Sequence, residues 1–200
     1  MKQFCIITVI ALLSIVFVNA QNVQFGAKAG VNFASINGDD TEEFDMRTSF
    51  HVGAVAEFLF SERFSLQPEL IYSSQGAKMS DEGFDFIIKL NYINLPIMAK
   101  YYVTEGLSLE VGPQFGLLLS AKAKSEFDGE SEEEDIKDDL NDFDFGINFG
   151  AGYKLENGLS FTARYNYGFS NLADSGSEDI GDTNFNNGVI QLSVGFNFKK

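Results

Sequence analysis

Apolar residues recur at every second position in eight segments of this chain. In residues 23–33 the apolar series is Val23, Phe25, Ala27, Ala29, Val31 and Phe33. The residues between them are polar or small, as in β-strands that bury one face and keep the other polar. The alternation returns in residues 49–60, 63–73, 91–103, 107–122, 143–155, 159–169 and 188–198. We therefore predict eight strands.

Glycine and charge are sorted between the two faces of these strands. The apolar face carries neither, whereas the other face mixes ionised side chains with glycines. Such a polar face suits the narrow lumen of a small closed barrel, and the apolar face suits contact with lipid. The fold is therefore predicted to be all-β, an eight-stranded antiparallel up-and-down transmembrane β-barrel. The glycines assigned to its interior are Gly26, Gly30, Gly53, Gly112, Gly116, Gly146, Gly150, Gly152, Gly168 and Gly195.

The connections between the predicted strands alternate in length. Tight turns are predicted at residues 61–62, 104–106 and 156–158, the last of which contains Asn-Gly, a strong hairpin signal. The other connections are polar and acidic and are predicted to be long loops, at residues 35–48, 74–90, 123–142 and 170–187. Outer-membrane barrels combine short periplasmic turns with longer extracellular loops, so both termini are expected on the periplasmic side.

Residues 1–20 are predicted to be a cleaved secretory signal peptide. Lys2 supplies a positive start, an apolar run of 15 residues follows from Phe4 to Val18, and the segment ends in the small-residue pattern Val-Asn-Ala. A membrane anchor is the alternative, but a spanning helix needs roughly 20 apolar residues. The mature barrel domain is predicted to be residues 21–200, in the outer membrane of a Gram-negative bacterium.

Composition narrows the classes of partner and of fold. The net charge of −15 argues against binding to nucleic acid or to anionic head groups and favours cationic partners. The only cysteine, Cys5, lies in the predicted signal peptide, so no disulfide and no metal site built on His or Cys is expected in the mature protein. A soluble barrel of lipocalin type is the alternative fold, but its narrow interior could not hold so many apolar side chains.

Charged residues of both signs fall on the predicted interior face. Four are cations and four are carboxylates, and the set is Lys28, Glu57, Glu69, Lys100, Glu110, Asp144, Lys154 and Arg164. Buried charges are tolerated when they are paired, so we predict a network of salt bridges that fills the lumen. Lys100 and Glu69 are the candidates for one pair, on sequential strands. The alternative role for these residues is a proton or ion relay.

Candidate catalytic and metal-binding residues are few. His51 is the only histidine, and a lipid-modifying barrel enzyme would use it as a base beside Ser49 or Ser35. Its place in the alternation, among the polar positions of its strand, directs it into the lumen and away from lipid. Residues 126–142 hold ten carboxylates and one lysine but lack the ligand spacing of a calcium-binding loop. We predict a solvated acidic loop there, with loose binding of divalent cations as an alternative.

Several strand motifs resemble those of a known family. The motifs are YINLPIMAKYY at 92–102, VGPQFGLLLSAK at 111–122, DFGINFGAGYKL at 144–155, ARYNYGFSNL at 163–172 and VIQLSVGFNF at 189–198. They resemble the signature strands of the PorT-like outer-membrane β-barrel domain, often described as the porin family. The resemblance implies the barrel fold and the outer membrane. The named member of that family belongs to a secretion apparatus, so a partner in a secretion or envelope complex is one expectation.

The sequence favours a non-enzymatic outer-membrane protein with no catalytic residues, cofactor or metal. Its predicted role is structural, or binding through acidic extracellular loops. The alternatives are a narrow passive pore and a lipid-active outer-membrane enzyme. The expected partners are outer-membrane lipid and, at the acidic loop, cationic ligands or divalent cations, and the protein is expected to be a monomer that does not bind nucleic acid.

Overall fold

The structure is a computed structural model that describes residues 23–38, 44–81, 84–127, 130–173 and 185–198. The predicted signal peptide, residues 1–20, lies outside the described residues. Among the residues described, no helix is both long enough and apolar enough to cross a membrane.

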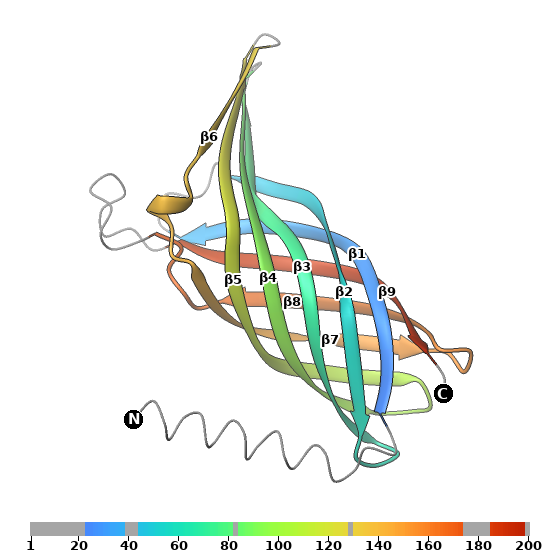
Figure 1. The fold of residues 1–200 in the computed structure, drawn as a ribbon. Coiled ribbons are helices and arrows are strands. Elements are labelled where there is room, and N and C mark those ends of the chain that lie inside the picture. The colour runs from blue at the N-terminus through green and yellow to red at the C-terminus, as the bar shows by residue number, and fades with distance from the viewer. Residues whose placement is uncertain (1–22, 39–43, 82–83, 128–129, 174–184, 199–200) are drawn as a thin grey trace, which may run out of the picture.

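The described part of the chain forms one antiparallel sheet that closes on itself (Figure 1). Its strands are β1 (Val23–Gly38), β2 (Asp45–Leu59), β3 (Phe64–Asp81), β4 (Phe84–Tyr102), β5 (Leu107–Phe127), β6 (Glu130–Asp135), β7 (Phe143–Lys154), β8 (Leu159–Gly168) and β9 (Phe185–Phe198). Pairing of β1 with β9 and of β4 with β5 closes a ring in the order β1-β2-β3-β4-β5-β7-β8-β9, and β6 adds to β5 outside the ring. The predicted eight-stranded antiparallel barrel is confirmed.

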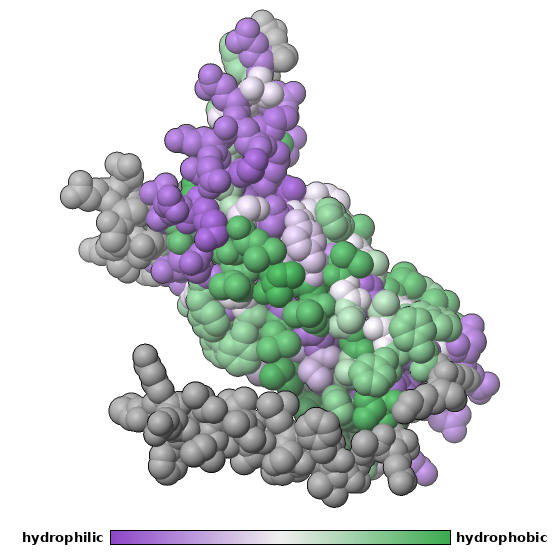
Figure 2. Space-filling model, in the orientation of Figure 1, coloured by the Kyte–Doolittle hydropathy of each residue, from purple (hydrophilic) through white to green (hydrophobic). Residues whose placement is uncertain are grey.

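The predicted facing of the strands is also confirmed. On β9, Leu192 and Val194 are 46% and 50% exposed, whereas Gln191 and Ser193 between them are each 6% exposed. Apolar side chains cover the visible outside of the ring in Figure 2. The alternating pattern therefore places the polar set in the lumen, as the period of a strand requires.

Much of two predicted loops, at residues 74–90 and 123–142, is instead regular strand. The β3–β4 hairpin takes up most of residues 74–90, and β5, β6 and a short 3-10 helix (Lys137–Asp139) take up most of residues 123–142. Strands β1, β2 and β9 likewise reach into the other two predicted loops. We call residues 74–81, 84–91, 120–127 and 130–135 the extension, a sheet that stands clear of the ring in Figure 1.

These connections are long, as predicted, but strands extend into them because the alternation continues there with inverted polarity. Along β4 the outward side chain is apolar at Ile93 but charged at Lys89. The inward side chain is polar at Asn94 but apolar at Leu90. A β-bulge in the β4–β5 pairing, where Leu119 is the extra residue, lies at this change. A charged outward face cannot contact hydrocarbon, so the inversion marks the end of the lipid-facing belt.

An apolar core covers the lumen at the end that carries the extension. It consists of the buried residues Ile36, Ala77, Leu90, Tyr92, Leu118, Ala121 and Leu172. Side chains of Phe44, Ile88, Ile136, Leu140 and Phe185 pack against it. Because successive inward positions of β4 lead from Asn94 to Tyr92 and Leu90, this core lies directly above the polar lumen.

Interior glycines allow neighbouring strands to approach closely. A Cβ placed on Gly112 would lie 1.9 Å from the carbonyl oxygen of Ile97, and one on Gly150 would lie 2.2 Å from that of Ala163. Neither contact could be relieved by a side-chain rotation, because backbone atoms are involved. The sorting of glycine to the interior therefore reflects the tight curvature of a small ring.

Candidate functional site

Seven charged side chains form a chain of contacts through the lumen. Their order is Lys28, Glu69, Arg164, Glu110, Lys100, Glu57 and Lys154, and cations alternate with carboxylates throughout. The N–O distances run from 2.7 Å for Arg164–Glu69 to 3.7 Å for Lys100–Glu57. Every charge of this series except the terminal Lys28 and Lys154 therefore lies between two charges of the opposite sign.

Arg164 links opposite walls of the barrel. Strand β8, which carries it, lies four places around the ring from β3, which carries Glu69. The guanidinium donates two hydrogen bonds to Glu69, of 2.7 and 2.9 Å, and two more to Glu110 on β5, of 2.7 and 2.9 Å. Such forked contacts give strong and geometrically specific pairing.

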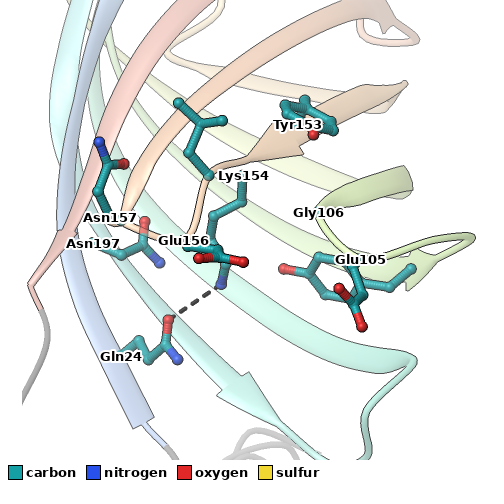
Figure 3. Close-up of a pocket in the computed structure, with 11 residues that line it drawn as sticks. Gln24, Glu105, Gly106, Tyr153, Lys154, Glu156, Asn157 and Asn197 are labelled. Atoms are coloured by element: carbon teal, nitrogen blue, oxygen red, sulfur yellow. Dashed lines mark hydrogen bonds between the residues drawn. The ribbon is translucent and has the colours of Figure 1, made fainter.

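The chain of charges ends in an open recess among the short turns. Lys154 lies 2.8 Å from Glu57 and also donates a hydrogen bond of 3.2 Å to Gln24, drawn as a dashed line in Figure 3. Glu57 further accepts hydrogen bonds from Ser65 and Tyr102. The recess has a volume of about 750 Å³ and is bordered by the turns that carry Glu105 and Glu156.

The structure brings together seven of the eight predicted lumen charges, but not in the predicted pairs. The proposed Lys100–Glu69 pair is wrong: Lys100 lies between Glu110 and Glu57 and also donates to Gln67, while Glu69 is held by Lys28 and Arg164. Sequence parity could place Gln67 in the lumen but gave no reason to choose it as the partner, because the tilt of the strands decides which side chains meet.

Asp144 lies outside this network, in a separate group of buried polar side chains. It accepts a hydrogen bond of 3.1 Å from Asn187, which also donates one of 3.3 Å to Tyr92. Asp144 makes no ion pair with any described residue. Asp144 therefore faces inward as predicted but is not part of the network, which contains four cations and three carboxylates.

His51 is buried and faces the lumen, but neither predicted serine contacts it. Its Nδ1 and Nε2 atoms lie 2.8 Å from Asn32 Oδ1 and Ser193 Oγ, respectively. Because an amide oxygen can only accept, Nδ1 donates to Asn32, and in the neutral imidazole Nε2 accepts from the Ser193 hydroxyl. Ser49 and Ser35 donate instead to the backbone oxygens of Ser74 and Gly188. The parity of Ser193 places it in the lumen, but only the closed ring brings it to His51.

Ion pairs line the outward face of the extension. Lys89 and Lys122 contact the two oxygens of Glu133 at 2.7 and 2.6 Å, and Lys124 contacts Glu126 at 2.8 Å. Hydrogen bonds from Lys122 and Lys89 lower the pKa of Glu133 to about 2. In the described part of the chain, no three His, Cys, Asp or Glu side chains are grouped as metal ligands would be.

The closed ring, with its apolar outer belt and charged lumen, defines a membrane-spanning β-barrel. Residues 19–174 match the family described as outer membrane protein beta-barrel domain, and the chain belongs to that family. It is therefore an outer-membrane β-barrel protein. Among curated proteins no match was found.

Solved barrels share this fold at low sequence identity. The attachment invasion locus protein Ail of Yersinia pestis is 16% identical with a TM-score of 0.51, and the match covers 88% of this chain and 98% of Ail. Neisserial surface protein A, NspA, is 14% identical with a TM-score of 0.54, and the match covers 88% of this chain and 99% of NspA. At such identities the likeness concerns the fold alone.

Proposed function

We propose that this protein is a non-enzymatic outer-membrane barrel that binds cationic ligands through the extension, which faces the cell exterior. The observation that carries the proposal is the extension itself, a sheet outside the lipid-facing belt whose strand β6 bears five carboxylates in six residues. The net charge of −15 favours the same class of ligand. Divalent cations are the smaller members of that class.

The proposed orientation follows from the asymmetry of the two ends. Long hairpins at one end and short turns at the other correspond to the extracellular and periplasmic ends of outer-membrane barrels. An epitope tag inserted at residues 128–129, between β5 and β6, should be detected on intact cells. A tag inserted in the turn at residues 156–158 should be detected only after the outer membrane is ruptured, and the reverse result would contradict the orientation.

The remaining assignments rest on sequence features. The pattern of residues 1–20 supports export by a cleaved signal peptide in a Gram-negative bacterium. The strand motifs support placement within the PorT-like group, and hence an envelope or secretion-complex partner. We propose a monomer that does not bind nucleic acid, surrounded by outer-membrane lipid.

A closed lumen is the part of the proposal that excludes the passive pore. The alternating charges and the apolar core above them leave little room for a continuous column of water. The purified protein in a planar bilayer should therefore pass little or no steady current. Large, stable channels from the unmodified protein would favour the pore.

The geometry around His51 supports the absence of enzymatic activity. Ser193, His51 and Asn32 are hydrogen-bonded in series, but all three are buried, with exposures of 6%, 1% and 0%. A substrate could not reach the Ser193 hydroxyl without opening the wall of the barrel. A fluorophosphonate probe should leave Ser193 unlabelled in folded protein. Labelling that is lost in Ser193→Ala would instead support a lipid-active enzyme.

Binding of a cationic polymer tests the central proposal. The mature protein in nanodiscs should bind fluorescent poly-lysine and should not bind heparin. Ail, by contrast, has been solved in complex with a heparin analogue, the polyanion sucrose octasulfate. The variant Glu130→Gln/Glu132→Gln/Glu134→Gln should bind poly-lysine more weakly. The matched variant Glu62→Gln/Glu105→Gln/Glu156→Gln, at the short-turn end, should bind as wild type does. Equal loss in both variants, or absence of binding by wild type, would refute the proposal.

A further inference from the structure

Strand β6 has a free edge. It is the last strand of the sheet order, pairs only with β5 among the described residues, and is exposed along all six residues. The N–H of Ile136 donates to the carbonyl oxygen of Ala121 at 3.1 Å, so the backbone of Ile136 points toward β5. The direction of the backbone N–H and C=O groups reverses from one residue of a strand to the next. Ser131, Glu133 and Asp135, which alternate with Ile136, therefore direct these groups toward the free edge.

The carboxylates of β6 differ between its two faces. Glu133, on the outward face, is already neutralised by Lys89 and Lys122. Glu130, Glu132 and Glu134 share the opposite face and make no ion pair with any described residue. Unpaired carboxylates therefore recur at every second residue along the free edge.

The face that carries these unpaired carboxylates holds apolar residues and Ser125 on the neighbouring strands. Phe86 on β4 and Ala123 on β5 line a recess of about 450 Å³ together with Glu132 and Glu134. Phe127, at the end of β5 on the same face, is 64% exposed. A ligand that extends along β6 can thus contact an apolar surface as well as carboxylates.

We propose that the free edge of β6 binds an extended peptide segment by strand addition. In this segment Lys or Arg occupies every second position, so that the cations lie beside Glu130, Glu132 and Glu134 while the backbone bonds to the outward-directed groups of β6. A second copy of the chain is disfavoured as the occupant, since two β6 edges would bring like charges together. The inference rests on the proposed function and specifies the ligand and its binding mode.

A peptide pair of identical composition tests the required pattern. The first is a nine-residue peptide in which lysine alternates with valine and threonine, and the second has the same residues with the lysines consecutive. Affinities are measured by fluorescence anisotropy against the mature protein in nanodiscs. The alternating peptide should bind more tightly to wild type. Removing backbone N–H groups by N-methylation at alternate residues of that peptide should abolish this advantage.

Variants of β6 separate strand addition from simple charge attraction. Glu132→Gln/Glu134→Gln should weaken binding of the alternating peptide about three- to tenfold, because two cross-strand charge pairs are lost. The control Asp138→Asn/Asp139→Asn removes the same charge from the neighbouring 3-10 helix and should have little effect. Ser131→Pro removes an edge N–H but no charge and should weaken binding about fivefold or more, whereas Ser131→Ala should not.

Each outcome has a distinct meaning. If poly-lysine binds wild type but the two peptides bind equally, or Ser131→Pro and N-methylation have no effect, strand addition is refuted and the proposed function stands. Equal weakening of peptide binding by Glu132→Gln/Glu134→Gln and by Asp138→Asn/Asp139→Asn would also refute the placement of the peptide's cations beside β6. If neither poly-lysine nor either peptide binds, the proposed function itself fails.

Discussion

Replacement of Arg164 by methionine is expected to destabilise the barrel by about 3 kcal/mol. The guanidinium is buried and donates four hydrogen bonds of 2.7 to 2.9 Å to Glu69 and Glu110. Removing one partner of a buried ion pair typically costs about 3–5 kcal/mol, because a charge is left uncompensated. Here Glu69 keeps Lys28 and Glu110 keeps Lys100, so the lower end of that range applies.

Lys154→Met provides a matched comparison at the end of the same network. Its side chain is 20% exposed, and Glu57 would retain Lys100, Ser65 and Tyr102 as partners. We expect a cost of about 1 kcal/mol or less. Combining Arg164→Met with Glu110→Gln should cost less than the sum of the single changes, by about 0.5–3 kcal/mol, because both remove the same contact.

Unfolding can be followed without an engineered reporter. The chain has no tryptophan, so the measurement is the gel-mobility difference between folded and unfolded barrel after equilibration in urea and lipid. The free energies of unfolding of Arg164→Met, Glu110→Gln, their double variant, Lys154→Met and wild type are compared under one lipid composition. If Arg164→Met costs no more than Lys154→Met, the buried network does not stabilise the barrel as argued.

Three further changes test other parts of the structure. Val194→Arg should cost roughly 2–4 kcal/mol by placing a charge in lipid, whereas Val194→Leu should be tolerated, and equal tolerance of both in a urea titration would contradict the facing of β9. Gly150→Ala should cost about 1–3 kcal/mol in the same titration because its Cβ would meet the carbonyl oxygen of Ala163, whereas Gly195→Ala, whose Cβ would first meet the movable Ser160 hydroxyl, should cost less, and equal costs would contradict the close approach of the strands at Gly150. Since the pKa of Glu133 is depressed from 4.5 to about 2, its ion pairs stabilise the extension above pH 4.5 and are lost as the pH falls toward 2. The protection factors of the β6 amides, which correct for the intrinsic pH dependence of exchange, should fall over that window in wild type but not in Glu133→Gln, and identical pH profiles would count against the assignment.

The sequence alone determined the strands of the ring and the direction of their side chains. Alternation with a period of two is a local property of an extended chain, so Val194 and Ser193 could be assigned to opposite faces without any knowledge of their neighbours. The same parity placed seven connected charges and ten glycines in the lumen. It also showed that His51 points away from lipid.

Only the tertiary structure decided which of these residues meet. Strand tilt and ring closure place Arg164 of β8 against Glu69 of β3 and Ser193 of β9 against His51 of β2, and neither contact follows from distance along the chain. The extension escaped prediction because its charged and apolar positions exchange faces beyond the bulge at Leu119, so its polarity suggested loops. Which face of a strand is apolar depends on whether lipid or water lies outside it, and that is settled by the position of the strand in the folded barrel.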